Sequence, residues 1–347
     1  MSGHRREGWL DALRFVAAFL VIVNHTNSHV FQAATPQQAT WWLSVVWYYV
    51  SKLAVPVFVL VSGACLLNRQ DSLRRSLGRF GRMLAALLVF SYAYYLYDAW
   101  VFWGLWPRMV NIGAFLQLVW TQQITDGFWY LYFYMGLMLM LPLLQRMCST
   151  MGEREQLYLM GLCFGLGAAW PLAAHYVPVL ALPQHFHVPL FTGYIGLFFA
   201  GRWVRERFVP TRARLLGAAA ALVLCIAASV VLTRIEFDRV APGAKYWFMD
   251  ERMQPSLFTI IGSIAVMMLA KGLAKECRCW ARLGGCAFGI YLVQDLLIAE
   301  TKERLFMPLC GVMNDFAAVL VWEALVFAVA LGAAWVMRRI PLIKKIV

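Results

Sequence analysis

The stretch from Trp9 to Val30, WLDALRFVAAFLVIVNHTNSHV, decides the fold class of this chain. It is apolar enough to cross a membrane as a helix, yet it carries Asp11, Arg14 and His25. The eleven steps from Arg14 to His25 make about three helical turns, so both side chains fall on nearly the same face, roughly 16 Å apart along the axis. Ionisable groups inside a membrane usually face a bundle interior or a wet cavity and mark function. The alternative is that Arg14 snorkels to the membrane surface while His25 forms a hydrogen bond between helices.

Similar apolar windows recur along the whole sequence. Of the 347 residues, 62% are hydrophobic and only 14% are charged, which leaves too little polar surface for a soluble globule of this size. We therefore expect an all-α polytopic membrane protein, in which each spanning helix needs about 20 apolar residues. About ten transmembrane helices are predicted, near residues 9–29, 42–67, 83–104, 127–146, 156–175, 189–206, 214–233, 256–271, 284–303 and 316–337.

The distribution of basic residues predicts the orientation of these spans. With the N-terminus in the cytoplasm, 22 of the 31 Lys and Arg residues lie on the cytoplasmic side, as the positive-inside rule requires. Arg14 and Lys52 lie within spans. The outer loops hold only Arg108, Arg234, Arg239, Lys245, Arg252, Lys302 and Arg304. We expect both termini to be cytoplasmic. The net charge of +13 then reflects topology and attraction to the lipid bilayer, and nothing in the sequence predicts nucleic-acid binding.

The chain is expected to be a single integral membrane domain over residues 1–347. The first apolar segment has no small-residue cleavage site and contains Arg14, so it should remain as the first span. The eight cysteines lie mostly within spans or on the cytoplasmic side, and Cys277-x-Cys279 has no second ligand pair at zinc spacing. We therefore expect core or loop cysteines and no metal. Because only 10 residues follow the last predicted span, no soluble extra domain is expected.

A second informative stretch, LLNRQDSLRRSLGRFGRMLAAL at residues 66–87, is rich in arginine. Arg75, Arg79 and Arg82 would share one helical face if this segment begins the third span. Arginine without lysine favours recognition of phosphate, because the planar guanidinium donates forked hydrogen bonds, although a topology signal alone is the alternative. Just upstream, the small-residue step from Ser62 through Gly63 allows close backbone approach to another helix or to a bound chain.

Six segments resemble, in order, the motifs of the acyltransferase-3 family of integral membrane O-acyltransferases. The first is LDALRFVAAFLVIVNHT, with Arg14 and His25, and the others are VPVFVLVSG, Arg79-x-x-Arg82, FWYLYFYMGLMLMLP, GYIGLFFAGRW and FGIYLVQDLLI. The resemblance runs from residue 9 to about residue 300. The chain departs from the family where histidine is frequent, having Gly127-Phe128 and Gln294 instead, and at Ala85-Ala86, where the family often has proline. These departures weaken a role for those positions.

The resemblance implies an O-acyltransferase of the bacterial cytoplasmic (inner) membrane. Such an enzyme would move an acetyl or other acyl group from cytoplasmic acyl-coenzyme A (acetyl-CoA) to a hydroxyl of a cell-surface glycan or its lipid-linked sugar precursor. It implies donor contacts at Arg75, Arg79, Arg82, Ser62 and Gly63. It implies acceptor contacts at Trp129, Tyr132, Tyr291 and Gln294.

The same resemblance suggests how the first helix would act. An extended pantetheine arm is about as long as the roughly 16 Å from Arg14 to His25, so the thioester would arrive near the histidine. His25 would be the general base on the acceptor hydroxyl, with an acyl-histidine intermediate as the rival mechanism. Arg14 would contact donor charge or the developing oxyanion, and Asp11 would hold its guanidinium.

A transporter is the main alternative to an enzyme. Ten spans with an intramembrane Arg and His also suit a proton-coupled transporter of a glycolipid or amphiphile. The sequence lacks the hydropathy repeat between residues 1–170 and 171–347 that such transporters often show, so we favour the enzyme. The sequence is also compatible with a homo-oligomer.

Overall fold

The computed structural model describes residues 7–101, 104, 111–182, 192–239, 255–275 and 277–347. Within these ranges the chain is helical and has no β-strand. Among the described residues, eight segments are long and apolar enough to cross a membrane: Gly8–Ala33, Ala39–Leu66, Leu73–Val101, Asp126–Thr150, Glu153–Tyr176, Arg212–Arg239, Cys279–Cys310 and Asp315–Met337. This confirms the prediction of an all-α polytopic membrane protein.

Several of these segments contain more than one helix. The first holds α1 (Gly8–Thr26) and α2 (Ser28–Ala33), and the second holds α3 (Ala39–Ser51) and α4 (Ala54–Leu66). The remaining helices are α5 (Leu73–Val101), α6 (Ile112–Thr121), α7 (Trp129–Thr150), α8 (Glu153–Phe164), α9 (Trp170–Tyr176), α10 (Gly193–Arg207), α11 (Arg212–Arg239), α12 (Leu257–Leu273), α13 (Arg278–Leu283), α14 (Ala287–Thr301), α15 (Met307–Cys310) and α16 (Asp315–Met337).

Each predicted span coincides with a helix, but two of the helices are short. α10 has 15 residues and α12 has 17, so neither reaches the length of an independent span. The predicted 189–206 span begins in residues outside the described ranges, and α10 starts at Gly193. The count of ten spans and the cytoplasmic placement of both termini stay predictions.

Polar side chains fix where several helices begin. The Ser256 hydroxyl accepts a hydrogen bond from the Thr259 amide at 3.2 Å, and the Asn314 side chain accepts one from the Phe316 amide at 2.9 Å. Asn111 accepts from two amides at the start of α6. Such caps satisfy backbone donors that a helix leaves without partners.

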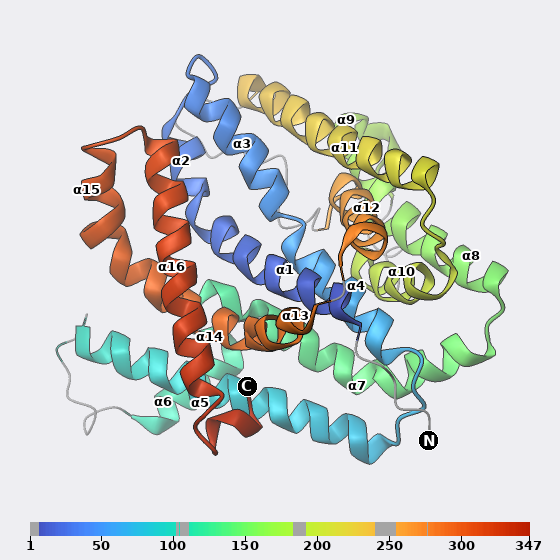
Figure 1. The fold of residues 1–347 in the computed structure, drawn as a ribbon, viewed down its shortest axis with the longest axis horizontal. Coiled ribbons are helices and arrows are strands. Elements are labelled where there is room, and N and C mark those ends of the chain that lie inside the picture. The colour runs from blue at the N-terminus through green and yellow to red at the C-terminus, as the bar shows by residue number, and fades with distance from the viewer. Residues whose placement is uncertain (1–6, 102–103, 105–110, 183–191, 240–254, 276) are drawn as a thin grey trace.

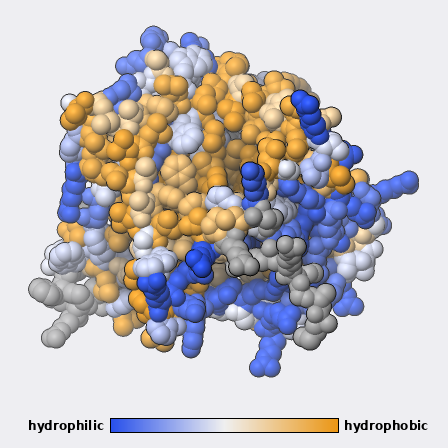
Figure 2. Space-filling model, viewed as in Figure 1, coloured by the Kyte–Doolittle hydropathy of each residue, from blue (hydrophilic) through white to orange (hydrophobic). Residues whose placement is uncertain are grey.

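α1 runs through the middle of the bundle (Figure 1), where it packs against α3, α4, α13, α14 and α16. α4 in turn packs along α10, α11 along α12, and α14 along α16. In Figure 2 apolar residues cover much of the upper and middle part of this face, while hydrophilic residues gather along its lower and right-hand edges. α1 is therefore surrounded by other helices over most of its length.

Two glycines set the crossing of α4 and α10. A Cβ added at Gly63 would lie 1.8 Å from the carbonyl oxygen of Phe198, and one added at Gly201 would lie 1.9 Å from the carbonyl oxygen of Leu60. No larger residue fits either position without moving a backbone. The close approach predicted at Gly63 is thus made by another helix, α10.

Candidate active site in a cavity beside α1

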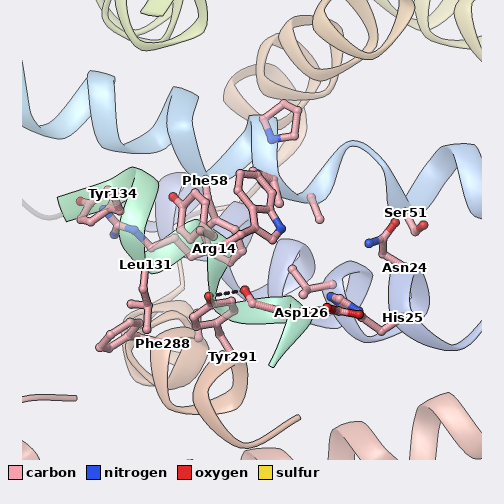
Figure 3. Close-up of a pocket in the computed structure, with 18 of the residues that line it drawn as sticks. Arg14, Asn24, His25, Ser51, Phe58, Asp126, Leu131, Tyr134, Phe288 and Tyr291 are labelled. Carbon is pink, nitrogen blue, oxygen red and sulfur yellow. Dashed lines mark hydrogen bonds between the residues drawn. The ribbon is translucent and has the colours of Figure 1, made fainter. Parts of the chain in front are cut away.

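A cavity of about 1220 Å³ lies against α1, and its walls also come from α4, α5, α7 and α14. Both Arg14 and His25 line it, so the helix face predicted from their spacing is the face that meets the cavity. Figure 3 shows His25, Asn24 and Ser51 toward one end and Arg14, Tyr134 and Phe288 toward the other. The volume exceeds the range of about 300–1,000 Å³ usual for one drug-sized ligand. Two substrates could therefore share it.

At the Arg14 end, the guanidinium is held by two groups. Its Nη1 donates to Asp11 Oδ1 at 2.7 Å, and its Nη2 donates to the Cys65 sulfur at 3.1 Å. The Asp11 side chain is buried, at 1% exposure, while that of Arg14 keeps 32%. A buried carboxylate thus fixes an arginine that still reaches the cavity, as predicted from their three-residue spacing.

At the His25 end, the residues that follow the histidine are anchored to other helices. Thr26 donates a hydrogen bond to Glu323 Oε1 of α16 at 2.9 Å, and Trp47 of α3 donates to Glu323 Oε2 at 2.9 Å. The Asn27 side chain donates to the Ser44 carbonyl at 2.6 Å. Because Thr26, Asn27 and Glu323 are fully buried, the last turn of α1 is held in place from two sides.

Aromatic side chains line the cavity between the two ends. Tyr130 lies between Phe58, with ring centroids 6.3 Å apart, and Tyr291, with centroids 6.0 Å apart. Trp129 lies against Tyr194 at 6.2 Å. The Tyr291 hydroxyl donates to the Gly127 carbonyl at 2.5 Å, the contact dashed in Figure 3. Ring faces of this kind pack well against sugars and other flat or apolar groups.

The arginines at the start of α5 divide into two sets. Arg82 lines the cavity, whereas Arg75 and Arg79 form ion pairs with Asp71 at 3.0 and 2.5 Å. Burial opposes ionisation of Asp71, but hydrogen bonds from Arg79, Gln145 and Arg75 outweigh it and lower its pKa to about 2. The predicted basic face therefore exists, but its charge is partly neutralised by a carboxylate four residues before Arg75.

The structure brings only some of the other predicted contact residues to the cavity. Ser62, Trp129 and Tyr291 line it. Gly63 packs on α10, and Tyr132 donates its hydroxyl to the Val119 carbonyl of α6 at 2.7 Å. Gln294 is fully buried away from the cavity wall, and neither its Oε1 nor its Nε2 has a hydrogen-bond partner within the described residues.

Several polar residues at the cavity were not singled out from the sequence. They are Asn24, Ser28, His29, Gln32, Lys52, Gln123 and Asp126. Ser28, His29 and Gln32 lie three, four and seven residues after His25, so helical periodicity could have indicated them. Lys52 lies within an apolar span, where an ionisable residue often marks function, but we used it only to predict the topology.

Apart from Cys65, which accepts a hydrogen bond from Arg14, the cysteines make no contribution to this site that the structure shows. Cys277 and Cys279 are joined by a disulfide, and the six other cysteines form no disulfide. Among the residues that the structure describes, no group of three or more His, Cys, Asp or Glu side chains could hold a metal ion.

Comparison with known proteins adds one finding to this geometry. A family model described as an acyltransferase domain matches residues 7–339, nearly the whole chain. No curated protein and no solved structure matches the chain.

Proposed function

The chain belongs to the acyltransferase-3 family, and we propose that this multi-pass membrane acyltransferase uses acyl-coenzyme A, with acetyl as the simplest acyl group, to acylate a hydroxyl of a cell-surface glycan or its lipid-linked precursor. One observation carries the proposal: Arg14 and His25 face a single cavity from one helix. The bacterial cytoplasmic membrane is the proposed location.

The donor would enter at the end of the cavity that Arg14 marks. Arg82 and the paired Arg14 offer positive charge and forked donors for its phosphates, and Ser62 adds a hydroxyl in the same wall. Arg79, held by Asp71, would support this entrance from behind. The pantetheine arm would then run along the aromatic wall toward His25.

His25 would act on the acceptor. In the general-base mechanism its imidazole takes the proton of the acceptor hydroxyl as the oxygen attacks the thioester carbonyl, and coenzyme A leaves as the thiol after the tetrahedral intermediate collapses. The separation of roughly 16 Å along α1 exceeds the combined reach of the two side chains. This favours a role for Arg14 in holding donor charge over contact with an oxyanion at His25, with Asp11 as its positioning residue.

The acceptor would bind close to His25, where polar residues such as Asn24, Ser28 and Ser51 line the cavity. Trp129 and Tyr291 offer ring faces for a sugar. Tyr132 and Gln294, which lie off the cavity wall, would contribute only through the positions of α7 and α14.

The test compares the surface glycans and lipid-linked glycans of cells that carry the wild-type protein, the His25→Ala variant or a deletion. By mass spectrometry, one glycan should lose an acetyl mass of about 42 Da per unit in both mutants, since loss of a general base typically slows a reaction about 10²–10⁴-fold. Purified wild-type protein should also release free thiol from acetyl-CoA when an acceptor is present. Unchanged glycans together with no thiol release would exclude the proposed activity.

A further inference from the structure

Lys52 places a primary amine in the cavity wall, at the joint between α3 and α4. Its Nζ lies 4.4 Å from the centre of the Tyr48 ring, a cation–π contact. Figure 3 shows its neighbour Ser51 beside Asn24 at the His25 end of the cavity. Because Lys52 directly follows Ser51 in the chain, its backbone belongs to the end of the cavity proposed for the acceptor.

No carboxylate among the described residues forms an ion pair with Lys52. Asp11 is engaged by Arg14, and both oxygens of Glu323 accept hydrogen bonds from Thr26 and Trp47. Asp126 faces the same cavity but lies beyond ion-pair distance of the amine. An ammonium group inside a membrane protein without a counter-charge is unfavourable, and ionisable groups that face an interior cavity often mark the path of a substrate or ion.

The start of α4 adds a second feature that favours an anion. α4 begins at Ala54, two residues after Lys52, and its N-cap residue Leu53 makes no side-chain hydrogen bond to the amides of Ala54 and Val55 in the first turn. Ala54 and Val55 line the cavity beside Lys52. The N-terminal end of a helix attracts negative charge, so the amine and the helix end act on the same region.

From this geometry we infer that Lys52 and the start of α4 bind a negatively charged group of the acyl acceptor, either a phosphate or a carboxylate. The inference rests on the proposed function, because it names the class of acceptor: an anionic sugar or sugar lipid rather than a neutral glycan. The anion holds the acceptor so that its hydroxyl meets His25. The donor phosphates stay at the Arg82 end of the cavity.

The experiment measures acetyl transfer from acetyl-CoA in phosphatidylcholine nanodiscs, whose lipids carry no net charge. Three acceptor probes are compared: octyl glucoside, octyl glucuronide and farnesyl diphosphate glucose. The proteins are the wild type, Lys52→Met, Lys52→Arg and the control Lys275→Met, whose lysine is exposed and does not line the cavity. Binding of each probe without donor is followed by the shift in the unfolding temperature.

The wild type should use one charged probe at least about 10-fold better in kcat/KM than octyl glucoside, a difference of about 1.4 kcal/mol. Lys52→Met should remove this preference by raising the KM of the charged probe, while Lys52→Arg and Lys275→Met keep it. The probe that loses its advantage identifies carboxylate or diphosphate as the anion. Because Lys52→Met removes an unpaired charge, its unfolding temperature should not fall.

Other outcomes separate the two proposals. Equal use and binding of charged and neutral probes by the wild type would overturn the inference, and so would an equal loss of kcat with every probe in Lys52→Met, which would assign the amine to the reacting carbonyl. If a charged probe stabilises the wild type but not Lys52→Met, and no probe is ever acetylated, the anion site stands and the acyltransfer proposal fails for these acceptors.

Discussion

Asp71 determines which arginines of α5 form ion pairs and which remain available to a ligand. Its side chain is shielded from solvent and pairs with Arg75 and Arg79, while Arg82 has no ion-pair partner among the described residues and lines the cavity. These three arginines, which share one face in the sequence pattern, therefore have different environments. Sequence spacing predicted their common face but could not show that a nearby carboxylate would occupy part of it.

Replacing Arg82 should impair donor binding more than replacing Arg75. Arg82→Ala should raise the KM for acetyl-CoA about 10-fold or more, because it removes a charge-assisted contact to phosphate. Arg75→Ala should change it less than about 3-fold, because Arg75 is 66% exposed and surface ion pairs contribute little. Steady-state kinetics on the two purified variants checks this, and equal effects would contradict the assignment of Arg82 to the donor.

The ion pairs of Asp71 should make the fold sensitive to acid. The folded pKa of Asp71, about 2, lies below its ordinary value of 3.8, so its stabilising contribution is complete above about pH 4 and is lost as the pH falls toward 2. Unfolding temperatures of the wild type should therefore drop through this window. Asp71→Asn should be less stable at neutral pH and should lose less stability between pH 4 and 2, and parallel curves for the two proteins would argue against it.

At the level of elements, α1 depends on its neighbours for the position of His25. Glu323 of α16 accepts hydrogen bonds from α1 and from α3, so one buried carboxyl group joins three helices at the histidine's end of the cavity. Hydropathy placed Glu323 within a predicted span, but nothing in the sequence indicated which helices it would contact. Such pairings depend on how the spans rotate about their axes, which a single amphipathic pattern leaves open.

Glu323→Leu should reduce both stability and activity. It leaves the part-buried Trp47 indole without its acceptor, at about 1–3 kcal/mol, and it removes the bond that ties Thr26 to α16, although the Thr26 hydroxyl keeps the Ile22 carbonyl at 2.9 Å as an acceptor. The kcat should fall with little change in the KM for acetyl-CoA, because the donor end of the cavity is distant. Thr26→Ser, which keeps the hydroxyl, is the matched control in thermal unfolding and kinetics, and a Glu323→Leu protein with wild-type kcat would exclude a positioning role.

The crossing of α4 and α10 should tolerate no side chain at its two glycines. Gly63→Ala or Gly201→Ala places a Cβ within 2 Å of a backbone oxygen, so one helix must move, at a cost of several kcal/mol or loss of the folded protein. Gly136→Ala in α7 is the control, since its Cβ would meet nothing within 4 Å and alanine favours the helix by about 0.5–1 kcal/mol. Yield and unfolding temperature in detergent measure the difference, and three equally stable variants would refute it.

For the whole molecule, the sequence predicted the class and most of the helices. Runs of apolar residues identify spans because the membrane core fixes their length, and each predicted span coincides with a helix. The cavity could be predicted only from α1, through the common face of Arg14 and His25. Its other walls come from distant segments such as α7 and α14, and those contacts have no local pattern that a single sequence displays.

The predicted topology implies that the two ends of the cavity open toward opposite sides of the membrane. In a protein whose native cysteines are replaced, Arg82→Cys should react with a membrane-impermeant maleimide from the cytoplasmic side. Gln32→Cys should react from the outer side. Labelling of intact cells and of inverted vesicles checks this. Reaction of both positions from one side would mean that the orientation or the span count is wrong.

A wet cavity alongside α1 also bears on the permeability of the membrane. Water that fills a path between the two sides can carry protons and small cations, and a leak of that kind would discharge the ion gradient across the membrane. Lys52 and Arg82 stand in this wall without ion-pair partners among the described residues, and fixed positive groups repel cations from a pore. The positive charges that are proposed to bind the anionic parts of two substrates would thus also reduce the leak of protons and cations through the cavity when no substrate is bound.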